Sequence, residues 1–359
     1  MSWLVVGAGF TGATVAERLA SAGEEVLVVE RRSRIGGSAE DYRADDGLLI
    51  QKYGPHVFHT NSERVWQYVQ RFGEWRPIKY RVAASVRGAL VPLPLDFRAV
   101  RACFETFAET NIERMTAEYG LGARVTLPQL RKSSPTFAEW AIDHVFRGYN
   151  EKHWGMPLED VPQSVIARLP FVVGEQDSYF TDKYQALPKD GYTAVIERML
   201  DHPKIHLVLN YDVEDLQEFQ RAVWTGSPDD FFGEAGALPY RSVHFRSERR
   251  GLHAAIAPYV TVTNPEHDGP TRTTDMHLMQ GAADRGPDNI RVYDHPCAYV
   301  PGKNDPFYPI PLESNIRLAQ EYAARRPKNV WFAGRLGSYS YLNMDQAIAQ
   351  ALALVVRIQ

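Results

Sequence analysis

The sequence predicts an α/β fold that is interrupted by a helical insertion and an antiparallel β-sheet insertion. The chain opens with an apolar run, Trp3 to Val6, then three glycines and a helical pattern over Ala13 to Ala22. It closes with a second apolar run, Asn329 to Ala333, a glycine turn and another helical pattern. Strand, glycine turn and helix in that order form the unit of an open α/β sheet. We expect the first and last segments to meet in one domain.

The opening glycines have the G-x-G-x-x-G spacing of a Rossmann-type dinucleotide site. Gly7 allows the tight turn, Gly9 a close approach of backbone to pyrophosphate, and Gly12 close packing of helix on strand. The helix N-terminus offers N–H groups to the phosphates. A second strand, over 25–29, ends in Glu30, at about the 20-residue distance of a ribose-binding acid. The alternative is a glycine-rich turn that binds nothing.

The residues after Glu30 favour FAD over NAD. A basic stretch from Arg31 closes in the pair Gly36-Gly37, as in flavoproteins of the glutathione-reductase type, which this pattern resembles. The closing turn, Gly334 to Gly337, and the helix with Asn343 as N-cap match the place where such proteins hold the flavin. The alternative is a closing βα unit without a ligand. The candidate cofactor contacts are Gly7, Gly9, Phe10, Thr11, Gly12, Glu30, Arg31, Gly36, Gly37, Ser38, His56, His59, Gly334, Arg335, Asn343, Met344 and Asp345.

The composition of the chain excludes several classes of partner and site. A formal net charge of −4 over 359 residues gives no reason to expect nucleic acid or an anionic membrane as partner. Two distant cysteines, Cys103 and Cys297, make no disulfide framework, and scattered histidines make no metal site. The sequence has no signal-peptide pattern and no apolar run long enough to span a bilayer. We therefore expect a cytoplasmic protein without a metal.

The pattern along the chain predicts discontinuous domains. Residues 80–97 alternate as strands, 98–157 are helical, and the segment from 240 to 300 alternates as antiparallel strands. The expected FAD-binding domain comprises residues 1–79, 186–230 and 324–359. The expected helical domain is 98–157. The expected antiparallel sheet domain comprises 80–97, 158–185 and 231–323, with a mobile substrate loop at about 163–177.

Aromatic and arginine residues suggest a second nucleotide beside the cofactor. Aromatic rings stack on bases, and arginine forks bind pyrophosphate. Taken singly, each such residue has the ordinary interpretation of a core aromatic or a solvated surface charge. The candidates are Tyr149, Asn150, Trp154, Arg168, Tyr179, Arg272, Tyr308, Arg335 and Tyr341.

Together these segments resemble the UDP-galactopyranose mutase family, from Gly7 to Leu354. The most specific pieces are KYGPHVFHTN at 52–61, KHWG at 152–155, YFTDKYQALP at 179–188, LPYRS at 238–242 and the run from Gly334-Arg335-Leu336 to 343–346. The resemblance implies an isomerase that interconverts pyranose and furanose forms of a nucleotide sugar, UDP-galactose first of all. It implies reduced FAD, whose N5 attacks the anomeric carbon, without net redox change.

The resemblance also assigns roles. Arg168, in the mobile loop, and Arg272 would grip the diphosphate from two sides. His59 and Arg335 would lie near the flavin. The candidate catalytic residues are therefore Arg168, Arg272, Arg335 and His59. The candidate substrate-binding residues are Tyr149, Asn150, Trp154, Tyr179, Tyr308 and Tyr341. The family further implies NADPH or NADH as reductant and a homodimer.

Several positions depart from the family pattern. Arg272 is followed by Thr273-Thr274-Asp275 where Ile-Ile-Glu is usual, and Asp294-His295-Pro296 replaces Glu-Tyr-Pro. Asn150 stands where threonine is usual, and Leu342 replaces an aromatic. A mutase of the same type that acts on a dTDP-, GDP- or modified UDP-sugar is therefore an alternative. An amine-oxidase-like FAD oxidoreductase and a non-catalytic flavin or nucleotide-sugar binder are the competing functions from different classes.

Overall fold

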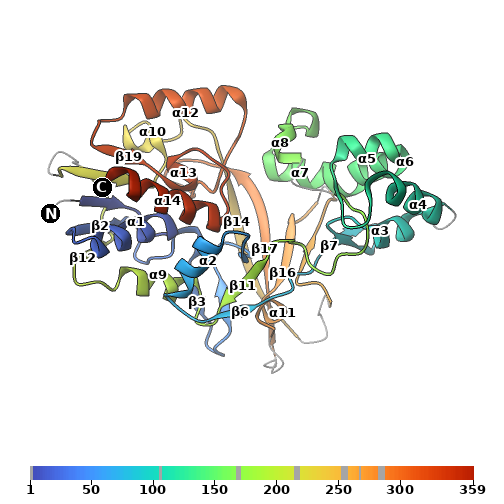
Figure 1. Cartoon of the computed structure of the whole chain (residues 1–359), viewed down its shortest axis with the longest axis horizontal. Coiled ribbons are helices and arrows are strands. Elements are labelled where there is room, and N and C mark those ends of the chain that lie inside the picture. The colour runs from blue at the N-terminus through green and yellow to red at the C-terminus, as the bar shows by residue number, and fades with distance from the viewer. Residues whose placement is uncertain are drawn as a thin grey trace. The chain divides into compact units, whose positions relative to one another are not determined.

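The structure is a computed structural model of the whole chain, which forms two compact units (Figure 1). It describes residues 3–104, 107–166, 171–213, 219–251, 258–266, 268–281 and 288–359. Unit 1 comprises residues 1–78, 182–242 and 298–359, and unit 2 comprises 79–181 and 243–297. Both units are discontinuous in sequence.

A five-stranded parallel sheet forms the centre of unit 1. Its order is β12 (Ile205–Leu209), β2 (Val26–Glu30), β1 (Trp3–Val6), β13 (Arg221–Trp224) and β19 (Val330–Phe332). The short runs of these strands are mostly apolar, as expected of strands covered on both faces. Leu4, Val29, Ala222, Trp224 and Val330 form one buried cluster on this sheet.

Helices from both chain ends pack together beside this sheet. The helix α1 (Phe10–Ser21) lies against α14 (Met344–Ile358) and α9 (Tyr192–Leu200), and Figure 1 shows α14 in red beside α1 in blue. Ala13, Val15, Ala16 and Leu19 of α1 are fully buried. The N- and C-terminal segments therefore pack together within unit 1.

The remaining elements of unit 1 are short. They are η1 (Gly37–Ala39), the hairpin β3 (Asp41–Arg43) with β4 (Leu49–Gln51), the sheet β5 (Phe58–Thr60), β11 (Tyr184–Pro188) and β6 (Trp75–Pro77), α2 (Glu63–Gln70), α10 (Pro228–Phe231), β18 (Tyr308–Pro309), α12 (Glu313–Arg325) and α13 (Gly334–Gly337). The first residues of β14 (Tyr240–Gly251) also belong to unit 1, where Tyr240 and Arg241 pair with β18.

Unit 2 contains a mostly antiparallel sheet. From β14 the order is β17 (Asp288–Ala298), β16 (Arg272–Asp275), β15 (Thr261–Thr263), β7 (Val82–Val86) and β8 (Ala89–Leu93). Only β15 and β7 are parallel among the registers described. The alternating pattern over 240–300 correctly predicts this sheet, but the short helix α11 (Met276–Gln280), capped by Asp275, is an addition.

Most of the helical segment of unit 2 follows the sequence pattern. Its elements are α3 (Phe97–Cys103), α4 (Ala108–Tyr119), α5 (Leu127–Ser133), α6 (Pro135–Ala141), η2 (Ile142–Phe146), α7 (Arg147–Trp154), η3 (Leu158–Asp160) and α8 (Gln163–Ile166), with the small strand pair β9 (Arg124–Val125) and β10 (Phe171–Val172). Ser134 precedes α6 and Pro135 is its first residue, a position that proline favours.

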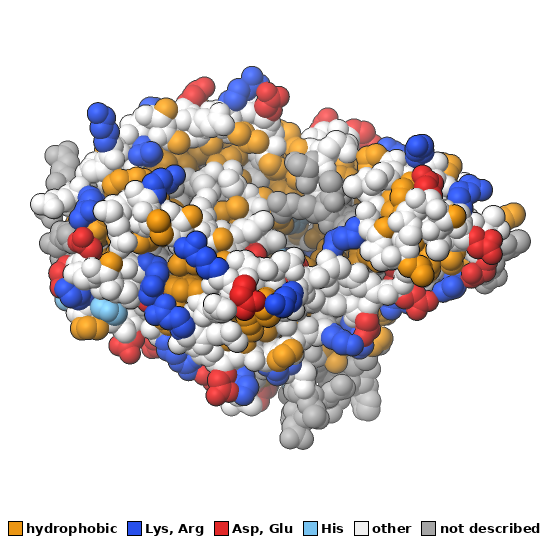
Figure 2. All heavy atoms as spheres, in the orientation of Figure 1, with side chains coloured by type: hydrophobic (Ala, Val, Ile, Leu, Met, Phe, Trp, Pro, Cys, Tyr) orange, Lys and Arg blue, Asp and Glu red, His pale blue; other side chains and the backbone are white. Residues whose placement is uncertain are grey.

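Two boundaries differ from the expectation in a way that matters for the site. Helix α1 begins at Phe10 instead of Ala13, inside the glycine motif. The segment expected as a glycine turn, Gly334 to Gly337, is the short helix α13. No helix within the described part of the chain has the length and apolarity to cross a membrane. On the face shown in Figure 2, acidic and basic side chains are interspersed.

Candidate active site

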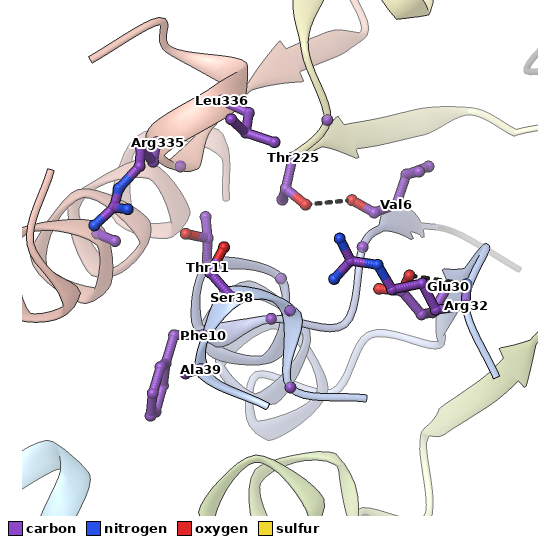
Figure 3. A pocket seen from close by; sticks show the side chains of 18 of the residues that line it. Val6, Phe10, Thr11, Glu30, Arg32, Ser38, Ala39, Thr225, Arg335 and Leu336 are labelled. Atoms are coloured by element: carbon purple, nitrogen blue, oxygen red, sulfur yellow. Dashed lines mark hydrogen bonds between the residues drawn. The ribbon is translucent and has the colours of Figure 1, made fainter. Parts of the chain in front are cut away.

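A cavity in unit 1 lies where the carboxyl ends of the parallel strands meet α1 and α13 (Figure 3). This is where ligands bind in open α/β sheets. Fifteen of the seventeen residues that the sequence predicts as cofactor contacts line it. They are Gly7, Gly9, Phe10, Thr11, Gly12, Glu30, Arg31, Gly36, Gly37, Ser38, His56, Gly334, Arg335, Asn343 and Met344.

The glycines of the opening motif leave no room for side chains at two positions. A Cβ on Gly7 would lie 2.1 Å from Thr225 Oγ1, and one on Gly12 would lie 1.9 Å from the carbonyl oxygen of Gly7. At Gly9 the nearest atom, Gly37 Cα, would be 3.6 Å away, which is an ordinary contact. Gly7 and Gly12 are therefore required by the packing of the protein itself, whereas Gly9 borders the cavity.

The N-terminus of α1 faces this cavity without a side-chain cap. Gly9 is the N-cap residue and no side chain bonds to the first N–H groups of the helix. The first N–H groups of a helix have no intrahelical partner, and they attract anions. Phe10, Thr11 and Gly12, which carry those groups, all line the cavity. The arrangement suits a phosphate or pyrophosphate.

Glu30 ends β2 at the rim of the cavity. Its carboxylate accepts hydrogen bonds from Ala8 N at 3.0 Å and Arg32 N at 3.0 Å, so its direction is fixed. Arg32 forms an ion pair with Asp305 at 3.0 Å, and Arg31 lies 3.3 Å from Asp230. These long-range acidic partners were not predicted.

The C-terminal segment closes the other side of the cavity. Gly334 has a φ of 83°, and a Cβ there would lie 2.8 Å from Thr11 Oγ1, so α13 approaches α1 closely. In Figure 3, Thr11 faces the helix that carries Arg335 and Leu336. Asn343 is the N-cap of α14, as predicted, and it forms a capping box with Gln346. The cavity thus joins segments from the two ends of the sequence.

Arg335 also joins the cavity to two of the predicted substrate tyrosines. The rings of Tyr308 and Tyr341 stack with centroids 5.5 Å apart. The Arg335 guanidinium carbon lies 5.3 Å from the centre of the Tyr308 ring and 5.7 Å from that of Tyr341. Arg335 Nε donates to Leu342 O at 2.9 Å, which fixes the side chain. The structure therefore brings these three predicted residues together.

Two predicted cofactor residues are not among those that line the cavity. His59, on β5, has Nδ1 2.9 Å from Asp182 Oδ2, and Asn61 bonds the other oxygen of Asp182 at 2.8 Å. Asp345 lies in the first turn of α14 with its Oδ1 buried and without a hydrogen-bond partner among the described residues. Their expected contacts with the cofactor stay predictions.

Sequence reasoning missed one wall of the cavity. This wall follows β13 and includes a glycine and an indole, with acidic residues from the neighbouring segments. The lining residues that the sequence did not predict, in this wall and elsewhere around the cavity, are Val6, Arg32, Ala39, Tyr211, Asp212, Trp224, Thr225, Gly226, Asp230, Pro306, Leu336, Leu342 and Ala347. The apolar run over 222–224 followed by Thr225-Gly226 was the available signal for a further strand of the parallel sheet.

Unit 2 carries a second group of predicted residues. Arg272, at the start of β16, bonds Asp294 on β17 with Nε 2.7 Å from Oδ2. Tyr179 N donates to Tyr80 O at 2.7 Å, and the rings of the two tyrosines meet edge to face at 6.2 Å. Burial raises the pKa of Tyr80 to about 12, and the nearby charge of Arg272 opposes this shift. Tyr80, which was not predicted, thus contacts Tyr179.

The candidates on α7 are mostly used within the unit. The Tyr149 ring stacks on His153 at 6.0 Å, and Trp154, which is buried, meets His153 at 4.9 Å. Asn150 is buried and its amide donates at 2.8 Å to the carbonyl oxygen of Phe146, the residue that precedes α7. Arg168 falls in 167–170, outside the described residues, so the expected loop arginine has no structural account.

Comparison with known proteins identifies the family. A family model described as UDP-galactopyranose mutase matches residues 144–341, and one described as an NAD(P)-binding Rossmann-like domain matches 5–72. A probable UDP-galactopyranose mutase of Klebsiella pneumoniae is 33% identical over 97% of this chain and 92% of its own. The chain belongs to the UDP-galactopyranose mutase family.

A second relative and a solved structure are also similar to this chain. A dTDP-fucopyranose mutase of Escherichia coli is 31% identical over 97% of the chain and 96% of its own length. A crystal structure of reduced UDP-galactopyranose mutase superposes with a TM-score of 0.76 at 15% identity, covering 99% of this chain and 93% of that one. The predicted family and fold class are confirmed. Within the described residues no group of His, Cys, Asp or Glu side chains is arranged to hold a metal ion.

Proposed function

We propose that this protein is an isomerase that interconverts the pyranose and furanose forms of a nucleotide sugar. The observation that carries this proposal is the similarity, over 97% of the chain, to two enzymes named as pyranose mutases. The amine-oxidase-like oxidoreductase and the non-catalytic binder are less well supported, because neither would resemble mutases along the whole sequence.

The cavity of unit 1 fits FAD. Gly9 and Gly37 leave backbone exposed beside the uncapped N-terminus of α1, where a pyrophosphate would lie, and Glu30 is oriented for a ribose. Gly334, Asn343 and Met344 would hold the flavin end. When bound and reduced, FAD would supply the nucleophile for the anomeric carbon. Arg335 would place a cation beside the reduced ring, where positive charge favours the anionic form.

The candidate substrate residues would bind the nucleotide sugar. Arg272 would grip the diphosphate with Arg168, and Tyr179 would donate its hydroxyl to a phosphate oxygen. Holding the diphosphate keeps the leaving group in place for its return to the sugar. Tyr308 and Tyr341, which Arg335 contacts, would add hydroxyl donors to the phosphates.

UDP-galactose is the first substrate to test, and dTDP-fucose is the second candidate. The relatives named for these two sugars are 33% and 31% identical to this chain, so identity does not separate them. The changes at Asn150, Thr273, Asp294 and His295 fall on the segments that carry proposed substrate residues, so a different nucleotide sugar is the alternative substrate. They do not alter the proposed reaction type.

One assay tests the reaction and the substrate together. The purified protein is reduced anaerobically with dithionite and incubated with UDP-galactopyranose, dTDP-fucopyranose and a GDP-hexose, and the products are separated by anion-exchange chromatography. We expect a furanose product from one nucleotide sugar, and none from the oxidised protein. If a pure, yellow sample converts none of the sugars, the proposal fails. Consumption of an amine with release of peroxide would support the oxidoreductase instead.

Three finer properties belong to the same proposal. We propose NADPH or NADH as the physiological reductant, a homodimer as the solution state, and closure of the 163–177 loop over the substrate. Anaerobic bleaching of the flavin absorbance by each nicotinamide nucleotide tests the first. Light scattering after gel filtration tests the second. Protease sensitivity of the loop, with and without UDP, tests the third.

A further inference from the structure

A buried ion pair in unit 2 stands behind the proposed diphosphate arginine. Arg272 and Asp294 are directly opposite in the register of β16 and β17. Asp294 Oδ2 accepts from Arg272 Nε at 2.7 Å and lies 2.5 Å from Nη2. The side chain of Asp294 is 1% exposed, while that of Arg272 is 22% exposed. The carboxylate therefore contacts the guanidinium from the protein interior.

The backbone around the carboxylate is fixed as well. Thr271 donates to Asp294 O twice, from its N at 2.8 Å and its Oγ1 at 3.1 Å. Two hydrogen bonds to one carboxylate oxygen define the plane of the guanidinium, because its N–H groups have a rigid planar geometry. An arginine side chain without such a partner would sample several rotamers.

Asp294 cannot contact a ligand directly in this arrangement. Its Oδ1 is buried away from solvent and has no hydrogen-bond partner among the described residues. Burial raises the pKa of the Asp294 carboxyl, and the neighbouring Arg272 opposes the shift. An atom that water does not reach is out of reach of a phosphate or a sugar hydroxyl. Any influence of this carboxylate on a ligand must therefore act through Arg272.

We propose that Asp294 is a positioning residue that holds the Arg272 guanidinium in the direction in which it binds the diphosphate of the nucleotide sugar. The proposal rests on the proposed function, since it requires that Arg272 grips a diphosphate. A carboxylate paired through one oxygen while the other is unpaired is a poor contributor to stability. Its place behind a partly exposed arginine has a purpose if the direction of that arginine matters.

A double-mutant cycle tests this inference with the FAD-loaded protein. The variants are Asp294→Asn, Arg272→Ala and the double variant, and the measurement is calorimetric titration with UDP and with dTDP, using whichever nucleotide the wild type binds more tightly. We expect Asp294→Asn to weaken binding about 10-fold in the wild-type background, comparable to the loss of one charge-assisted contact. In the Arg272→Ala background the same substitution should change the affinity less than about twofold.

Controls separate positioning from folding. Glu139→Gln removes the charge of the partner of Arg131, whose Nε and Nη2 bond the Glu139 carboxylate at 2.8 and 3.4 Å in the same unit, and should leave nucleotide affinity unchanged. If Asp294→Asn does not fold, Asp294→Glu, which keeps the charge, replaces it and should bind within about threefold of wild type. For Asp294→Asn, an equal loss in both backgrounds, or no loss, overturns the inference; for Asp294→Glu, a loss of about 10-fold or more despite the retained charge overturns it. Wild-type affinity in Arg272→Ala refutes the proposed diphosphate grip instead, whatever Asp294 does.

Discussion

The pair Gly9→Ala and Gly12→Ala separates cofactor binding from folding in the opening motif. A Cβ on Gly12 would lie 1.9 Å from Gly7 O, so backbone must move by more than 1 Å to reach an ordinary contact of about 3.4 Å. Overpacking against backbone costs about 3 kcal/mol or more. A loss of that size lowers the melting temperature by roughly 6–12 °C for a unit of this size.

Gly9→Ala should behave in the opposite way. Gly9 has a φ of −90°, which any residue adopts, and its added methyl would meet only Gly37 Cα at 3.6 Å and Gly36 O at 3.8 Å. The apoprotein should therefore melt within about 2 °C of wild type, because alanine at a compatible position is neutral or slightly stabilising. The methyl borders the space proposed for the pyrophosphate, so FAD affinity should fall about 10- to 100-fold.

Differential scanning fluorimetry of the apoproteins and fluorescence titration with FAD give both numbers. The reasoning is refuted if Gly9→Ala binds FAD like wild type. It is equally refuted if Gly12→Ala folds with an unchanged melting temperature, because a Cβ would then be tolerated where the structure leaves no space.

Three further substitutions test the structure of unit 1. Asn343→Ala removes the capping box of α14 and should lower the free energy of unfolding, measured by urea denaturation, by about 1 kcal/mol. An unchanged free energy of unfolding would contradict a stabilising role for this cap. Burial alone would raise the pKa of Glu17, but hydrogen bonds from neighbouring side chains outweigh burial and lower the pKa. The ionised Glu17 therefore stabilises the fold above about pH 4.3, and this stabilisation is lost as pH falls through the lowered pKa. Glu17→Gln should therefore destabilise by about 1–3 kcal/mol at pH 7 and by less at about pH 3.5; an equal loss at both would contradict this. Gly191→Ala should cost about 3 kcal/mol, because φ is +95° and a Cβ would lie 2.7 Å from Asp41 Oδ2, whereas the control Gly23→Ala, at φ +99° in open space, should cost clearly less by the same denaturation assay.

Much of the cofactor cavity was predictable because its determinants are local. The spacing of Gly7, Gly9 and Gly12 fixes a turn and a helix start within a few residues, and Glu30 follows from the length of one βα unit. The wall that follows β13 was missed because Thr225 and Gly226 come after a short strand with no motif of its own. The short apolar run at 222–224 was its signal in the sequence, but its place in the sheet is recognisable only from its parallel pairing with β1 and β19.

The sequence alone determined the fold class, the dinucleotide cradle and the family, since these depend on local backbone requirements and on motifs read in order. Only the tertiary structure decided which charges meet. Asp305 bonds Arg32, and Asp294 bonds Arg272, across separations along the chain that no periodicity encodes. Such pairs depend on strand register and on the route of distant loops, and a one-residue shift of β17 would turn Asp294 to the other face of the sheet.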